Sequence, residues 1–200
     1  MLLRVALETR SHHAAADADR LGILQEPSAA RCRGLLGRIF GFEAPVEAAI
    51  AHTPGIDPAV LRGRNRMSLL ARDLVALGMT AGEIVELPRL HLPSRFSTAT
   101  RALGWLYVVE RSALVHGLVL RHLVSQLPST MTGARAYLAA YEGSAGERLR
   151  TLGLALGEVA RDAGAADAIV EGAKEAFHAQ HRWLTVLRAR GELAPQRAAG

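Results

Sequence analysis

Two residues near the N-terminus have the types and spacing of a metal ligand with a supporting carboxylate. His13 and Asp17 are four residues apart and share one face of a helix, and three alanines lie between them. A carboxylate, or a water that it holds, can orient the imidazole and leave the other ring nitrogen free to bind a metal. The alanines would let a flat ligand approach closely. The same spacing also occurs in surface ion pairs, so the motif alone leaves both interpretations open.

The segment 102–120 is the second stretch with residues that could do chemistry. Ala102 and Gly104 are small, Tyr107 can offer a hydroxyl, and the adjacent Glu110 and Arg111 place two charges beside an otherwise apolar stretch. A helix of this kind can lie against a flat prosthetic group. It can equally be a central core helix with no ligand.

The C-terminal region contributes apolar and histidine side chains. Phe177, Trp183 and Leu184 lie near one helical face, which favours core packing. His178 and His181 are three residues apart and could bind a metal together, but no carboxylate or third histidine has a matching helical offset.

Several functional classes are disfavoured by the composition. Cys32 is the single cysteine, which excludes an intramolecular disulfide and a multi-cysteine metal cluster. The formal net charge of +5 permits anionic ligands, but the densest basic group, Arg62, Arg64 and Arg66, has no interleaved aromatic residues and is typical of a solvated helix face. We therefore expect no nucleic-acid partner. Serine-hydrolase, phosphate-loop and paired-carboxylate signatures are also missing.

The elements that must position these residues are helices. Alanine and leucine dominate and only 4% of residues are aromatic, which predicts an all-α fold. We expect one helical domain over residues 1–190 and a disordered tail over 191–200. The predicted helices cover 2–18, 28–50 with an interruption at 41–45, 58–77, 80–86, 102–120, 129–142, 144–162 and 165–190, with an extended connector at 87–93.

The expected location is the cytoplasm, with no membrane partner. No apolar run reaches the roughly 18 to 20 residues that span a bilayer. The N-terminal residues turn polar too early for a signal-peptide core.

Three segments, in this order, resemble the bacterial, biliverdin-producing heme oxygenases that are associated with bacteriophytochromes. The family's N-terminal pattern, roughly LR-x-x-T-x-x-x-H-x-x-x-(E/D), is matched by Thr9, His13 and Asp17. The pattern of its distal helix, roughly A-L-G-x-x-Y-V-x-E-G-S-x-L-G-G, is matched by Ala102, Leu103, Gly104, Tyr107, Val108, Glu110, Ser112 and Leu114. Its C-terminal F-x-x-x-x-x-W-L is matched by Phe177, Trp183 and Leu184.

This resemblance implies a helical bundle with heme between the first helix and the distal helix. His13 would be the proximal iron ligand, with Asp17 as its supporting carboxylate. The heme propionates would be contacted by Arg10 and Arg150, with Arg148 as a less certain neighbour of Arg150. Tyr107 and Ser112 are the candidate catalytic residues on the distal helix.

The resemblance also implies an enzyme for which heme is both cofactor and substrate. The family cleaves heme to biliverdin, CO and iron, and it uses O2 and electrons from an external donor protein. A phytochrome is the expected acceptor of the product. The protein itself supplies ligation, orientation and control of the distal pocket.

The chain departs from the family pattern at the three glycines of the distal helix. Arg111, Val115 and His116 occupy these positions, and Gly117 lies one residue late. Glycine lets a backbone approach the heme face closely, whereas larger side chains fill that space. Three hypotheses follow.

In the first hypothesis, His116 is a second axial ligand and the six-coordinate heme serves sensing or storage. In the second, Gly117 replaces a missing glycine and activity is kept, while Arg111 binds a propionate or Glu110. In the third, the pocket is closed and the protein is a scaffold without enzymatic activity.

Overall fold

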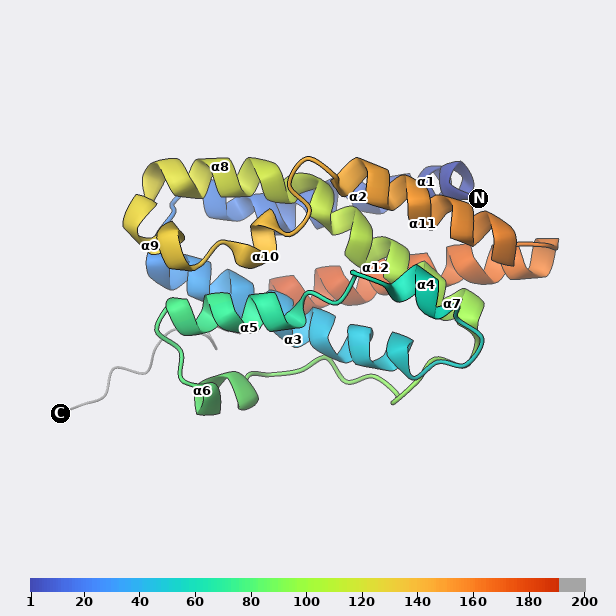
Figure 1. Ribbon diagram of the computed structural model, residues 1–200, viewed down its shortest axis with the longest axis horizontal. Coiled ribbons are helices and arrows are strands. Elements are labelled where there is room, and N and C mark those ends of the chain that lie inside the picture. Colours follow the sequence, from blue (N-terminus) through green and yellow to red (C-terminus); the bar gives the residue numbers. More distant parts are fainter. Residues whose placement is uncertain (191–200) are drawn as a thin grey trace.

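The computed structural model describes the backbone of residues 1–190 and the side chains of residues 1–185, and all regular secondary structure in that part is helical (Figure 1). The prediction of an all-α single domain is confirmed. The predicted tail, 191–200, lies outside the described residues. In chain order the elements are α1 (Leu2–Glu8), α2 (Arg10–Leu21), η1 (Gly22–Leu24), α3 (Ala29–Ala51), α4 (Pro58–Leu61), α5 (Met67–Ala76), α6 (Ala81–Val85), α7 (Ala99–Ser112), η2 (Ala113–Val115), α8 (His116–Gln126), α9 (Pro128–Gly133), α10 (Ala136–Ala139), α11 (Ala145–Val159) and α12 (Ala163–Arg190).

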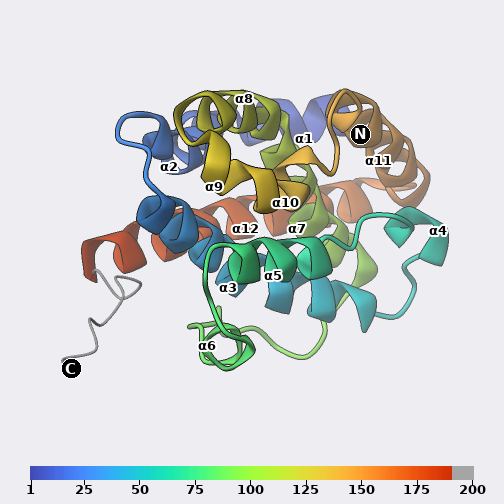
Figure 2. The same cartoon turned by 60° about the vertical axis from the view of Figure 1, so that its left-hand side comes forward.

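Helix α7 lies at the centre of the bundle, and every residue from Ala102 to Ser112 is buried. The long helix α12 runs beside it in both views (Figures 1 and 2). The two backbones meet at glycines: a Cβ on Gly104 would lie 2.6 Å from Ala173 N, and a Cβ on Gly172 would lie 2.5 Å from Arg101 O. The small size of Gly104 therefore serves contact with α12 and not, as the sequence suggested, the approach of a flat ligand.

Two apolar clusters form the core. One surrounds α7 and α12 and includes Phe42, Trp105, Tyr107 and Phe177. The other joins α3, α5, α8 and α10 and includes Ile39, Leu70, Leu120 and Tyr137. Helix α3 contributes to both clusters, because buried residues occur all round its circumference.

Three predicted helix starts are confirmed by side-chain caps. Ser28 accepts a hydrogen bond from Arg31 N, and Asp57 accepts one from Ala59 N. Thr80 and Glu83 form a reciprocal capping box at the start of α6. These caps depend only on neighbouring residues, which explains why the helix starts could be predicted from the sequence.

The predicted interruption of the second long helix at 41–45 is wrong, because α3 is continuous through Pro45. Proline has no N–H to donate to the carbonyl four residues earlier, which is that of Gly41. Leu90 N donates to Gly41 O instead, at 2.8 Å. The connector 87–93 thereby repairs the hydrogen bond that the proline removes.

Four other predicted helices are divided. The first breaks at Thr9, whose hydroxyl donates to Val5 O at 2.7 Å. The predicted helix 58–77 separates into α4 and α5, and 129–142 separates into α9 and α10. The distal helix is interrupted by the 3-10 turn η2, so that His116 begins a new helix.

The segment Ala99–Gln126 contains a window long and apolar enough to cross a membrane, with a mean hydropathy of 1.3. The expectation from the sequence that no apolar run reaches this length is therefore wrong. Within the described residues, 72% of this window is buried inside the protein, because α7 is the central core helix. Burial in the core accounts for its apolar character.

Candidate functional site

His13 lies on α2, a helix in which only Ala16 and Arg20 are buried. Its ring is half-buried with its centroid 5.4 Å from that of Phe177, and Nε2 is 3.1 Å from Thr9 Oγ1. Burial lowers the pKa of His13, and the positive charge of Arg111 lowers it further. The imidazole is therefore neutral at pH 7, the form that binds metals.

Asp17 faces the central helix. Its two carboxylate oxygens accept hydrogen bonds from the guanidinium of Arg111 at 2.7 and 2.9 Å. The sequence pattern predicts instead that Asp17 supports His13 and that Arg111 binds a propionate or Glu110. Asp17 and Arg111 bind each other because α2 and the end of α7 lie side by side. The two parallel N–H donors of a guanidinium also match the two oxygens of a carboxylate.

Thr9 stands between His13 and Tyr107, a role that the sequence analysis did not assign. It is fully buried at the break between α1 and α2, and it is hydrogen-bonded to the side chain of Tyr107. The Tyr107 ring packs edge-on against Phe177 at 6.3 Å, and burial raises the pKa of its hydroxyl. Thr9 and the ring of Phe177 therefore each contact both His13 and Tyr107.

The remaining candidates do not converge on His13. Ser112 is buried and its hydroxyl donates to Val109 O at 2.7 Å, while Val115 is half-buried in η2. Arg10 is exposed at the start of α2. Arg150 is exposed near Gly146 of its own helix, and Arg148 donates to Gly63 O at 2.6 Å.

His116 faces a different part of the core from His13. It is 4% exposed, and its ring lies 4.9 Å from that of Tyr137. Burial lowers the pKa of His116 well below its ordinary value, and the charges of Arg66 and Arg20 act in the same direction. His116 is therefore a neutral member of a charged cluster.

This cluster joins four elements of the bundle and was missed from the sequence. Glu43 accepts from Arg20 at 2.9 Å and from Tyr137 at 2.8 Å, and Arg66 lies 3.6 Å from its other oxygen. All four side chains are almost fully buried. Two signals were available: Glu43 is charged within the apolar helix α3, and Arg20 follows His13 by seven residues on the same helical face.

The other histidines do not form a metal centre. His12 stacks on Phe177 and meets His178 edge-on, and His181 pairs with Asp19 at 2.9 Å. Within the described residues no group of three or more histidine, cysteine, aspartate or glutamate side chains could hold a metal ion. His13 remains the candidate for an axial ligand to a prosthetic group.

The environment of His13 fits the role of a heme ligand. His13 is neutral, half-buried and supported by Thr9, as an axial ligand requires. One turn further along α2, Asp17 forms an ion pair with Arg111 that bridges α2 and α7. The chemistry of His13 suits heme, and the nearby ion pair joins α2 to the end of α7 in the described conformation.

The fold and site define a class of protein: a single-domain helical bundle that presents one imidazole from an N-terminal helix beside an interrupted central helix. The chain belongs to the heme oxygenase family, whose model matches residues 3–186. The search of curated proteins found no match to the chain.

Proposed function

We propose that this protein binds heme between α2 and the α7–α8 segment, with His13 as the proximal ligand. Family membership implies heme as the ligand. The observation that carries the proposal is the neutral, half-buried imidazole of His13, held by Thr9 beside the central helix. Arg10 and Arg150 are exposed and form no ion pair within the described residues, so both are available to heme propionates.

The activity proposed for this site is oxidative cleavage of heme. Bound heme would supply the iron and the reacting macrocycle, with O2 and an external electron donor, and the products would be biliverdin, CO and iron. In this proposal His13 would bind the iron and Thr9 would orient its imidazole. Phe177 and Tyr107, which pack beside them, would exclude water. A bacteriophytochrome-associated role, a phytochrome acceptor and a cytoplasmic location belong to the same proposal.

Access to the site depends on the ion pair between Asp17 and Arg111. It lies between α2 and α7, where the family pattern has a glycine in place of Arg111. Binding of heme therefore requires this ion pair to open. The freed guanidinium of Arg111 can then bind a carboxylate of the ligand.

The proposal gives His116 no role as a ligand. Its ring lies against Tyr137, within the cluster of Arg20, Glu43 and Arg66. A second axial ligand would have to leave this cluster and face His13. We therefore expect heme with a single histidine ligand.

A hemin titration followed through the Soret band tests the proposal. The intact chain should bind one hemin with a five-coordinate spectrum, and His13→Ala should abolish that spectrum. His12→Ala is the matched control, because His12 is the adjacent residue and also contacts Phe177, and it should keep the spectrum. Uptake that is unchanged in His13→Ala would exclude His13 as the ligand.

Two further measurements separate ligation from turnover. His116→Ala should leave the coordination state unchanged, and a six-coordinate spectrum that this variant converts to five-coordinate would restore the hypothesis of two ligands. Biliverdin formation from the hemin complex with O2 and a reductant tests the reaction. A stable hemin complex that yields no biliverdin would limit the function to heme binding.

A further inference from the structure

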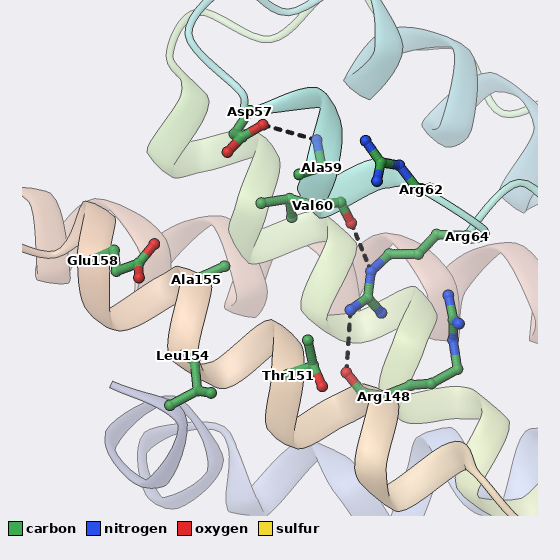
Figure 3. A pocket seen from close by; sticks show the side chains of 10 residues that line it. All are labelled: Asp57, Ala59, Val60, Arg62, Arg64, Arg148, Thr151, Leu154, Ala155 and Glu158. Carbon is green, nitrogen blue, oxygen red and sulfur yellow. Dashed lines mark hydrogen bonds between the residues drawn. The ribbon is translucent and has the colours of Figure 1, made fainter.

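A groove on the opposite side of α11 from α1 has no part in the proposed heme site. Helix α11 packs on α1 through Gly153, where an added Cβ would lie 2.7 Å from Leu2 Cβ. Its other side faces α4 and the turn after it, and the groove between them has a volume of about 340 Å³ (Figure 3). Ligand pockets begin near this size. The lining residues that carry the argument are Asp57, Val60, Arg62, Arg148, Ala155 and Glu158.

One end of the groove is basic. Arg64 is buried there and fully engaged: its Nε donates to Val60 O, one terminal nitrogen to Glu110 and the other to Arg148 O. Arg148 uses one terminal nitrogen for Gly63 O, and its Nε is buried without a hydrogen-bond partner. Arg62 is exposed. In the described part of the chain neither Arg62 nor Arg148 pairs with a carboxylate, so both guanidinium charges are uncompensated.

The position of this basic end is fixed by the backbone. Gly63 has a φ of +67°, which turns the chain sharply between Arg62 and Arg64. Arg148 holds that turn through Gly63 O, and Arg64 returns a hydrogen bond to Arg148 O at 3.2 Å. The guanidinium of Arg148 also stacks on Tyr141, 4.2 Å from the ring centroid. The charged end is thus preorganised.

The other end of the groove is acidic. In Figure 3 Asp57 and Glu158 lie on one side of the view and the three arginines on the other. Glu158 forms no ion pair within the described residues, and Asp57 uses one oxygen to cap Ala59 N. Arg148 and Glu158 are ten residues apart on α11, which corresponds to about 15 Å along the helix axis. Val60 and Ala155 form the walls between the two ends.

We propose that this groove binds a small aliphatic zwitterion, with its carboxylate at Arg62 and Arg148 and its amino group at Glu158. The guanidinium donors match a carboxylate in shape and charge. The short apolar body of the ligand lies against Val60 and Ala155. The groove lies apart from His13, Asp17 and Arg111, because none of its residues contacts these three in any described interaction. The proposal assigns Arg148, which the family resemblance placed near a propionate, to this groove instead.

The test is an NMR titration of the full chain with ε-aminocaproate, caproate and hexylamine. ε-Aminocaproate should bind most tightly and shift the resonances of the groove residues. Caproate should bind about tenfold more weakly, because it lacks the group that pairs with Glu158. Hexylamine should show no saturable binding. Equal affinity for ε-aminocaproate and caproate, or no binding of either, would overturn the proposal.

Variants at the two ends of the groove assign the contacts. Arg62→Gln should weaken ε-aminocaproate and caproate by about tenfold each. Glu158→Gln should weaken only ε-aminocaproate, to the level of caproate. Arg121→Gln, at an exposed position on α8 outside the groove, is the control and should change nothing. Both groove positions are exposed, so these variants should fold as the intact chain does.

Inorganic phosphate tests the assignment of the anionic group. Phosphate that displaces ε-aminocaproate more strongly than caproate does would overturn the assignment of a carboxylate. Hemin binding should be unchanged in Arg62→Gln. The proposal of a zwitterion site and the proposal of a heme site can therefore be refuted independently of each other.

Discussion

Asp17 and Arg111 join α2 to α7 through two parallel hydrogen bonds, 2.7 and 2.9 Å long, next to the face that carries His13. Their side chains are 27% and 11% exposed, so water reaches the pair only in part. The sequence separation of 94 residues makes this a contact between the N-terminal helix and the core. An ionic contact of this kind can open and reform without loss of apolar packing.

Arg111→Ala should speed hemin uptake, because it removes the ion pair that the proposed heme site requires to open. Loss of a partly buried, charge-assisted pair lowers the cost of opening enough to increase the association rate by about tenfold. Stopped-flow absorbance at the Soret band measures this rate. Arg101→Ala is the matched control on the same helix, since Arg101 pairs with Glu175 at 2.8 Å in an exposed position. Equal rates in all three chains would show that the ion pair does not control access.

The sequence predicts the parts of the fold that depend on neighbouring residues. The starts of α3, α4 and α6 could be predicted because each is capped by a side chain, Ser28, Asp57 or Thr80, that bonds a backbone N–H two or three residues away. The continuity of α3 through Pro45 could not be predicted in this way. The carbonyl of Gly41, which receives no hydrogen bond from Pro45, accepts one from Leu90 N instead. That contact exists only after the chain has folded.

The same distinction applies to the candidate site. His13, Asp17 and Arg111 could all be named from their types and spacing. Their pairing could not, because the choice of Arg111 as the partner of Asp17 depends on how α2 packs on α7. The contact between Arg20 and Glu43 could not be predicted for the same reason. A charged residue on a helix is expected to be exposed unless a buried partner for it is known.

Glu43→Gln should destabilise the protein by about 3 to 5 kcal/mol. The carboxylate of Glu43 lies against the guanidinium groups of both Arg20 and Arg66, and the substitution leaves two buried charges without a counterion. Urea unfolding measures the free-energy change. Glu175→Gln, which removes the exposed partner of Arg101, should cost less than about 1 kcal/mol. A cost for Glu43→Gln as small as that of Glu175→Gln would contradict a structural role for the cluster.

Glu47 should make the protein less stable as the pH rises. Burial raises the pKa of Glu47 from 4.5 to about 7, although a hydrogen bond from Arg66 N opposes the shift. The protonated carboxyl therefore contributes stability that is fully present below pH 4.5 and is lost as the pH rises through about 7. Because the side chain is partly exposed, the loss should be about 1 to 2 kcal/mol.

The comparison of Glu47→Gln with the intact chain isolates this effect. Glutamine does not titrate, and all other groups titrate in both chains. The difference in unfolding free energy between the two chains should change by the predicted amount between about pH 5 and about pH 8, in favour of the variant at high pH. A difference that is constant over this interval would mean that Glu47 titrates normally.

Gly104→Ala should destabilise the protein by about 2 to 4 kcal/mol, because the new Cβ would meet backbone that cannot rotate away. Its nearest neighbours would be Ile169 O, Ala173 N and Gly172 C, all in α12. Gly157→Ala is the matched control, since no atom lies within 4 Å of a Cβ added there on α11. That substitution should stabilise the chain by about 0.5 to 1 kcal/mol, as alanine favours helix over glycine. Thermal and urea unfolding of the two variants measure the change in unfolding free energy, which should be opposite in sign for Gly104→Ala and Gly157→Ala. Stabilisation by both alanines would mean that α7 and α12 do not meet at Gly104, and that its small size is free to serve a ligand after all.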